Sequence, residues 1–184
     1  MRKGHRIPFL FLLAWVLCLN GCSIRQTEPG RFPTPARLHK VVPYKQEPHL
    51  CGPYALAAVL NYLGQEADPA KIADRIYSPG VRGVLTMDLY LEARRHGTKV
   101  RQVSGTLIDL YREMEKGSPA IVLLKYPALG QTPGHFIVVA GYSDDPDGFY
   151  ILWGDGGLSW MKENQFKDLW SRSGFWTLFF EGNN

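Results

Sequence analysis

Cys51 is the residue of this 184-residue chain whose type and setting point most directly to covalent chemistry. The chain has three cysteines; Cys18 lies inside an apolar N-terminal run, and Cys22 stands where that run would be cleaved. Cys51 is therefore expected to lack a disulfide partner, and a lone thiol in an exported protein is a candidate reactive group. It also stands where a helix should begin, a position that lowers thiol pKa values. The competing interpretation is a small, inert core residue.

A cysteine nucleophile needs a base that takes its proton and a third group that orients the base. Of the five histidines, His135 is the best placed, because it begins a predicted strand directly after the loop sequence Thr132-Pro133-Gly134. A histidine at such a position can face a cleft. His5 and His39 precede the predicted domain, and His96 ends a predicted helix. His135 is therefore the expected base.

Asp155 is the expected orienting group for His135. Two predicted strands, 136–142 and 149–153, are joined by a turn-rich stretch and should form a hairpin, in which residues facing each other have a constant index sum. Sums of 290 or 292 place His135 opposite or diagonal to Asp155 on one face of the sheet. A sum of 291 would place them on opposite faces.

Gln46 completes the candidate site as an oxyanion-stabilising residue. An oxyanion can be held by a backbone N–H at a helix start, here that of Cys51, together with a side-chain amide. Gln46 lies five residues before Cys51. Alone it would be interpreted as an exposed loop residue, but the nearby Cys51-Gly52-Pro53 sequence favours the functional interpretation. His49 and Cys51 do not form a metal site, because zinc needs three or four ligands. We expect no metal and no cofactor.

The remaining pattern predicts helices first and an antiparallel sheet afterwards, which is typical of the α+β class. The helix at 52–63 is apolar nearly all round and should be central and buried. The other predicted elements are helices at 68–77, 86–96, 106–116 and 165–171, and strands at 100–103, 120–126, 136–142, 149–153 and 175–180.

The N-terminal residues 1–21 have the pattern of a signal peptide: Arg2, Lys3 and Arg6 precede an apolar run that is too short to span a membrane. The run ends in Leu19-Asn20-Gly21-Cys22, which resembles a bacterial lipoprotein signal and implies lipidation of Cys22. Ordinary secretion with cleavage nearby is the alternative. Residues 22–40 are polar and proline-rich and should form a flexible tether. Residues 41–184 suffice for one domain.

The charge balance gives no support for nucleic-acid binding. Of the 21 Lys and Arg residues, three leave with the signal, so 21 − 3 = 18 bases face 17 acids and the mature charge is about +1. No basic run stands out. Ser23 follows Cys22, and in Gram-negative lipoproteins a residue other than Asp at that position accompanies outer-membrane sorting. The resemblance therefore implies the periplasmic face of the outer membrane.

Three segments together resemble the C39 family of papain-like cysteine peptidases, and in particular its stand-alone bacterial lipoproteins. They are 46–63, 134–142 and 153–155, with Gln-x4-Cys-Gly-Pro as the specific block. The resemblance implies a papain-like fold with a helical lobe and a sheet lobe. It makes Cys51 the nucleophile, His135 the base and later acid, Asp155 its orienter and Gln46 an oxyanion donor.

The function expected from this resemblance is an envelope-tethered cysteine peptidase that hydrolyses peptide bonds as a monomer. Relatives fused to peptide exporters clip leaders after a double glycine, and an exporter is a candidate partner here. Leu50 stands where many relatives carry Asp, so double-glycine cleavage is not assumed. Two alternatives stay open: a transglutaminase-like acyl-transfer enzyme, and a peptidase-like module that binds peptides without cutting them.

Overall fold

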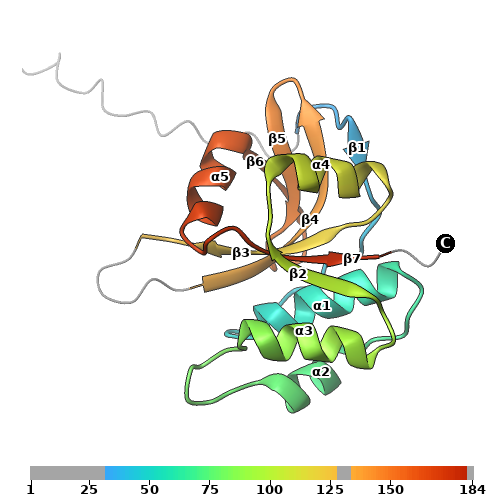
Figure 1. Ribbon diagram of the computed structural model, residues 1–184, viewed down its shortest axis with the longest axis vertical. Helices are drawn as coiled ribbons and strands as arrows, with labels where there is room; N and C mark the ends of the chain where they lie inside the picture. Colours follow the sequence, from blue (N-terminus) through green and yellow to red (C-terminus); the bar gives the residue numbers. More distant parts are fainter. Residues whose placement is uncertain (1–31, 128–133, 182–184) are drawn as a thin grey trace, which may run out of the picture. The chain divides into compact units, whose positions relative to one another are not determined.

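The structure, a computed structural model, describes residues 32–127 and 134–181. Three helices come early in the chain and most strands of an antiparallel sheet come later, which confirms the predicted α+β class. Helices α1–α3 lie on one side of the sheet, and α4 and α5 lie on the other (Figure 1). The elements are β1 (Arg37–Leu38), α1 (Cys51–Tyr62), α2 (Pro69–Ile76), α3 (Thr86–Arg95), β2 (Val100–Ser104), α4 (Leu107–Glu115), β3 (Ala120–Lys125), β4 (Gly134–Asp144), β5 (Asp147–Leu152), β6 (Leu158–Lys162), α5 (Glu163–Ser171) and β7 (Trp176–Phe180).

Helix α1 lies in the middle of the helical layer, as its all-round apolar sequence predicts. Every residue from Ala55 to Leu60 is buried, and the helix packs against β4 as well as α2 and α3. Pro53 sits in the first turn, where the missing N–H would have no helical partner. Burial on all sides therefore fixes α1 firmly and holds its first residue, Cys51, beside the start of β4.

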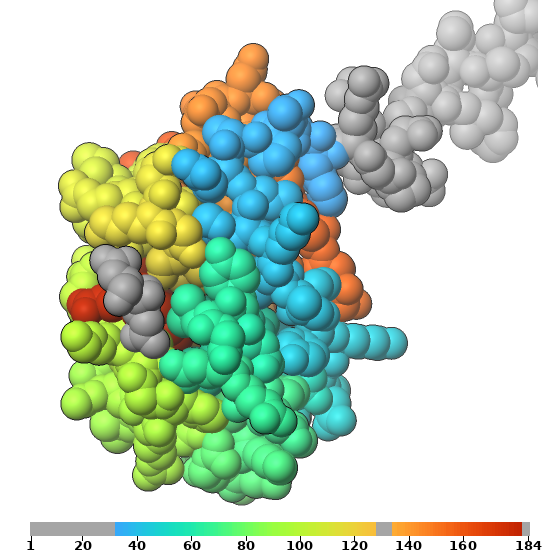
Figure 2. Space-filling view, turned by 90° about the vertical axis from the view of Figure 1, so that its right-hand side faces the viewer, coloured from blue at the N-terminus to red at the C-terminus, as the bar shows by residue number. Residues whose placement is uncertain are grey.

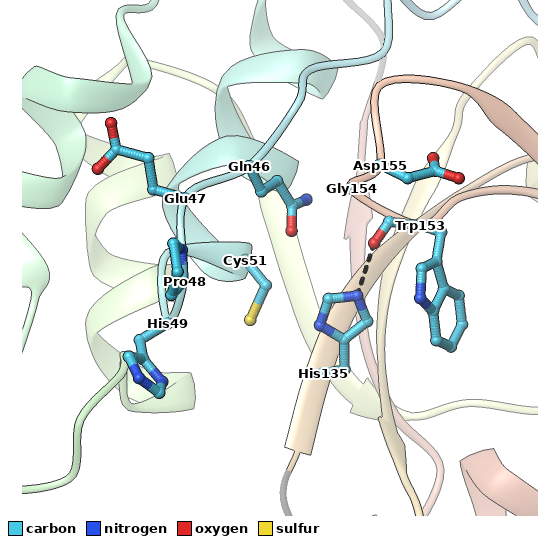
Figure 3. A pocket seen from close by; sticks show the side chains of 9 residues that line it. All are labelled: Gln46, Glu47, Pro48, His49, Cys51, His135, Trp153, Gly154 and Asp155. Carbon is cyan, nitrogen blue, oxygen red and sulfur yellow. Dashed lines mark hydrogen bonds between the residues drawn. The ribbon is translucent and has the colours of Figure 1, made fainter.

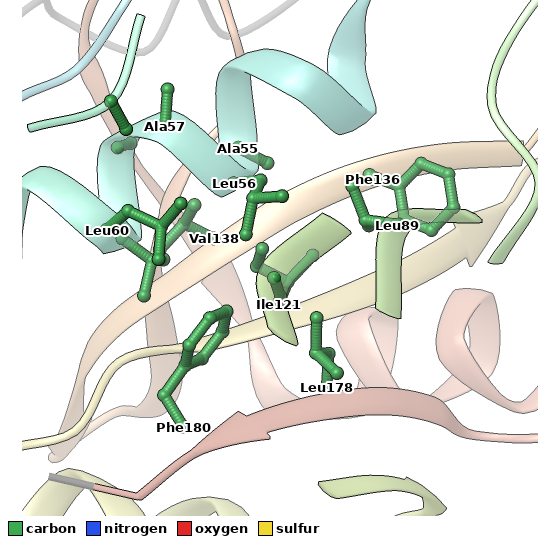
Figure 4. Close-up of a cluster of buried hydrophobic side chains, with 14 of the residues drawn as sticks. Ala55, Leu56, Ala57, Leu60, Leu89, Ile121, Phe136, Val138, Leu178 and Phe180 are labelled. Carbon is green, nitrogen blue, oxygen red and sulfur yellow. The ribbon is translucent and has the colours of Figure 1, made fainter. Parts of the chain in front are cut away.

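Alternate side chains of β4 pack into two separate hydrophobic cores, one on each face of the sheet. Phe136 and Val138 pack with α1, Leu178 and Phe180 on one face of the sheet (Figure 4). Side chains of the opposite parity pack with α4 and α5 on the other face; this second core includes Ile137, Val139, Phe149, Phe166 and Trp170. Because both faces of β4 are covered, its register is strongly fixed, and so is the position of its first residues.

The sheet order is β2-β7-β3-β4-β5-β6, with β1 added on β4. The sequence did not predict β1 or β6; β1 has two residues, and β6 mixes polar and apolar side chains without clear alternation. Both strands form because an open edge of backbone N–H and C=O groups lies beside them, which residue types alone do not reveal.

A β-bulge at Ala140 changes the register of the β4–β5 hairpin. Near the turn Tyr142 faces Phe149, whereas toward the other end Val138 faces Leu152, so the index sum falls from 291 to 290. A constant sum was expected from the sequence, and the extra residue in β4 breaks it. Strand β5 then ends at Leu152, so the ladder stops before it reaches Asp155.

The folded unit begins at Phe32, earlier than the domain start expected at residue 41. Arg37 pairs with Tyr142 in the sheet and forms an ion pair of 2.7 Å with Glu115. The Tyr150 hydroxyl donates to the carbonyl of Pro33. Figure 2 shows these N-terminal residues, in blue, lying directly against the orange β4–β5 hairpin. Backbone pairing therefore fixes the last part of the stretch that was expected to be a tether.

The predicted signal peptide, residues 1–21, and the lipidation candidate Cys22 lie outside the described residues. Within the described ranges, no helix combines the length and the apolar character that a membrane crossing requires.

Candidate functional site

Cys51 is the first residue of α1 and lies half-buried at an open pocket of about 350 Å³. The preceding residue, Leu50, has no polar side chain to cap the helix, so the first backbone N–H groups of α1 stay available near the thiol. Helix and sheet residues both line the pocket (Figure 3): Gln46, Glu47, Pro48, His49, Cys51, His135, Trp153, Gly154 and Asp155. The structure thus brings all four predicted site residues to one pocket.

His135, the second residue of β4, faces Cys51 across the pocket. Its Nε2 lies 2.7 Å from the carbonyl oxygen of Trp153. A carbonyl can only accept, so in the neutral ring Nε2 carries the proton and donates it. Nδ1 is then the unprotonated nitrogen, and in Figure 3 it is the nitrogen that lies toward the Cys51 sulfur. The tautomer is therefore the one in which His135 can accept a proton from the thiol.

Burial shifts the pKa values of the two groups in opposite directions. It raises the pKa of the Cys51 thiol above its ordinary 9.0, although backbone interactions with Phe136, Gly52 and Cys51 itself oppose the rise. It lowers the pKa of His135 below 6.5, opposed by the bond to the Trp153 carbonyl. Desolvation thus opposes the lowering of the thiol pKa that was expected from the helix start, and it favours the neutral form of both groups.

Gln46 and Gly154 fit against each other at the sheet side of the pocket. The Gln46 backbone N–H donates to the Gly154 carbonyl at 2.8 Å. Gly154 has φ +101°, and a Cβ added there would lie 2.2 Å from Oε1 of Gln46. Only glycine allows this approach. No role was expected for Gly154, although its position directly before Asp155 was the available signal.

Asp155 reaches the pocket, but its carboxylate points away from His135 (Figure 3). It is exposed, and its Oδ1 accepts a hydrogen bond of 3.0 Å from the backbone N–H of Gly157. Its backbone forms an isolated antiparallel bridge with Lys45. Within the described residues, no hydrogen bond joins Asp155 to His135, so the arrangement expected from the hairpin register is not present in the structure.

The Trp153 ring lines the pocket beside His135, and the Tyr126 ring packs against it. The His135 and Trp153 ring centroids lie 4.9 Å apart, and Trp153 meets Tyr126 edge-on at 5.6 Å. The sequence placed Trp153 near the cleft only as a wall. In the structure it contacts the imidazole with its ring and also with its main chain, a contact that no residue pattern signals.

His49 also lines the pocket, and its Nε2 is 3.2 Å from Nη2 of Arg82. Because the guanidinium can only donate, Nε2 of His49 accepts. In the part of the chain that the structure describes, no group of three or more His, Cys, Asp or Glu residues could hold a metal ion.

The sequence matches the family model described as "Peptidase_C39 like family" over residues 38–176, most of the chain. The chain belongs to the C39-like peptidase family. No curated protein shows significant sequence similarity to this C39-like chain.

Solved structures of C39 peptidases share the fold of this family member. A protein from Bacillus anthracis, described as a candidate C39-like peptidase, is 18% identical with a TM-score of 0.66, and the match covers 83% of this chain and all of that one. The peptidase domain of Streptococcus ComA, a bifunctional ABC transporter of a quorum-sensing pathway, is 19% identical with a TM-score of 0.63, covering 78% and 99%. A double-glycine-motif protease from an AMS/PCAT transporter, in complex with the leader peptide, is 19% identical with a TM-score of 0.63, covering 84% and 100%. These likenesses confirm the predicted papain-like fold.

Proposed function

We propose that this C39-like protein is a cysteine peptidase that hydrolyses peptide bonds. The observation that carries the proposal is the facing pair of the Cys51 sulfur and the unprotonated Nδ1 of His135 in an open pocket. A thiol opposite a base is the arrangement that nucleophilic acyl transfer requires. Membership of the C39-like family supports peptides as the substrate class.

The proposed reaction runs through an acyl-enzyme. The Cys51 sulfur attacks the scissile carbonyl while its proton passes to Nδ1 of His135. The backbone N–H of Cys51 and the side-chain amide of Gln46 stabilise the oxyanion. The C–N bond then breaks, and His135 gives the proton to the leaving amine. A water molecule deprotonated by His135 attacks the thioester, and the acid leaves as the thiol is restored.

Product analysis separates this function from its two alternatives. The purified protein is incubated with a peptide library, with and without an excess of a simple primary amine, and the products are analysed by mass spectrometry. A peptidase gives free acids and new amino termini in both cases. A transferase gives amide adducts only when the amine is present. A binding module gives a stable peptide complex and no cleavage products, which would refute the proposal.

The pKa directions predict a bell-shaped dependence of kcat/KM on pH. Its acid limb should lie below the ordinary histidine pKa of 6.5, and its alkaline limb above the ordinary cysteine pKa of 9.0. The pKa of His135 lies below 6.5, so its basic form, and hence activity, should persist somewhat below pH 6.5. Burial raises the pKa of the Cys51 thiol above 9.0. Activity should therefore fall on the alkaline side only above pH 9.0, where the thiol loses the proton that His135 passes to the leaving amine. Kinetics at constant ionic strength, with circular dichroism to exclude unfolding, would measure both limbs. An acid limb above pH 6.5 would contradict the neutral pair.

We also propose that the protein is anchored to the bacterial envelope through lipid on Cys22, on the strength of the signal-like pattern in residues 1–22. Cys22→Ala should move the protein from the membrane fraction to the soluble fraction, because the lipid attachment point is lost. Fractionation followed by immunoblotting measures this. Cys18→Ala, which removes a thiol from the apolar run but leaves Cys22, is the matched control and should stay with the membrane. Equal fractionation of both variants would refute the anchor.

A further inference from the structure

We infer that a second hollow, which adjoins the pocket of Cys51 and is lined by Leu50, Asp74 and Tyr77, is a substrate subsite for the side chain of a lysine or an arginine. This inference deepens the proposed function and rests on it, because it names a side chain that the cleaved peptide should carry. The basic residue lies on the helical side of Cys51, a few residues from the scissile bond.

The first support is the position of the hollow beside the nucleophile. It has a volume of about 480 Å³, and its lining residues are Pro48, Leu50, Ala73, Asp74 and Tyr77. Pro48 lines both spaces, and Leu50 directly precedes Cys51 in the chain. In Figure 3, Pro48 lies on the same side of the pocket as Cys51, across from His135. An extended peptide advances about 3.3 Å per residue, so a side chain a few residues from the attacked carbonyl can reach the hollow.

The second support is the chemistry of the lining. Most of the wall is apolar, because it is formed by the proline ring, the Leu50 and Ala73 side chains and the Tyr77 ring, which stays 37% exposed. Lysine and arginine side chains bury their methylene stems on such surfaces while the charged end stays in water. Asp74 adds a carboxylate to the same wall. The lining therefore matches both parts of a basic side chain.

The third support is that the Asp74 carboxylate has no partner within the described ranges. It lies exposed on α2, and among those residues it forms neither a hydrogen bond nor an ion pair. The next residue, Arg75, is bonded to Glu92 instead. Asp68, by contrast, caps α2 by accepting from the N–H of Ala70. Asp74 is thus free to bind a cation that arrives with the substrate.

The fourth support is the charge of the surroundings. Tyr54 lies one turn into α1 and donates its backbone N–H to the Leu50 carbonyl. Partial burial and the negative charges of Glu47 and Asp68 raise the pKa of the Tyr54 hydroxyl. Two further carboxylates therefore act on this part of α1. Their field attracts a basic side chain and repels an acidic one.

A positional-scanning peptide library tests the subsite. Each pool carries Lys, Arg, norleucine or Glu at one fixed position, and norleucine supplies the apolar stem without the charge. At one position near the scissile bond, we expect the wild type to cleave the basic pools roughly threefold to fivefold faster than the norleucine pool, because an exposed ion pair contributes modestly. The Glu pool should be the slowest. Equal rates for all pools at every position would overturn the inference and leave the proposed function standing.

Two variants connect the preference to Asp74. Asp74→Asn keeps the size of the side chain and removes its charge, so it should cleave the basic and norleucine pools at equal rates. Asp74→Lys reverses the charge, so the Glu pool should become faster than the Lys pool. Neither change should unfold an exposed helix position, which circular dichroism would verify. The matched control Asp144→Lys, at the far end of β4, should keep the wild-type order. A basic preference that persists in both Asp74 variants would refute the inference.

Peptide binding gives a second readout that needs no cleavage. The Cys51→Ala protein is incubated with the same pools, and the retained peptides are quantified by mass spectrometry. We expect it to retain the basic pools best and the Glu pool least, and to lose this order when Asp74→Asn is added. That order of retention in a protein whose wild type cleaves no peptide would refute the proposed function and leave the inference standing. Neither retention nor cleavage of any pool would refute both.

Discussion

Alanine in place of Cys51 is expected to reduce peptide hydrolysis by at least about 10⁴-fold, because the variant has no atom that can form the acyl-enzyme. The pocket, the imidazole and the oxyanion donors would remain, so substrate binding should change little. Initial rates on a peptide identified in the library digest would measure the loss. Retained turnover in this variant would falsify the proposed mechanism.

Two controls connect that loss to the thiol itself. Iodoacetamide should label the wild type at Cys51, located by peptide mapping, and should abolish cleavage in proportion to labelling. Cys51→Ser keeps the size and the hydrogen-bonding capacity of the side chain but is a weaker nucleophile, so it should fold like the wild type and still be nearly inactive. Thermal unfolding of the three proteins would show that the fold is intact.

Glutamine in place of His135 is expected to lower kcat by roughly 10³-fold, within the range that general acid–base catalysis contributes. Its side-chain NH₂ can still donate to the Trp153 carbonyl, so the local structure should survive. What disappears is a group that can take the thiol proton and return it to the leaving amine. Steady-state kinetics should show the loss mainly in kcat, with KM nearly unchanged.

Thiol alkylation of His135→Gln distinguishes a neutral Cys51 thiol and His135 imidazole from a preformed thiolate–imidazolium pair. In a neutral pair the thiolate fraction at pH 7 is small with or without the imidazole, because the pKa of the Cys51 thiol is raised by burial. The rate of iodoacetamide labelling should therefore differ little between the wild type and His135→Gln. A steep fall in labelling rate at pH 6 in the variant would mean that His135 stabilises a resting thiolate, contrary to the neutral pair.

Much of the scaffold could be predicted from residue periodicity. Helix α1 and strands β3, β4 and β5 are strongly patterned, and the structure confirms them. The bulge at Ala140 could not be predicted, because an extra residue in an apolar strand leaves its composition unchanged. The packing of residues 32–40 was missed for a related reason: it combines backbone pairs with β4 and scattered side-chain contacts, such as Arg37 with Glu115, which polar, proline-rich composition conceals.

The candidate site was predictable where it depends on side-chain type. Cys51, His135 and Gln46 carry distinctive chemistry, and the structure places them at one pocket, while their roles stay predictions. Asp155 was chosen because carboxylates are the familiar partners of histidine. The atom that actually meets Nε2 belongs to the backbone of Trp153. A carbonyl has no signature in a sequence, so only coordinates can reveal it.

If Cys22 carries the proposed lipid, the position of Phe32 as the first described residue limits the distance between the membrane and the folded domain. Ten residue steps separate Cys22 from Phe32, and a fully extended chain gains at most about 3.5 Å per residue. The segment between them could therefore span no more than about 35 Å. With that anchor, the candidate site would stay in the layer of solvent next to the bilayer.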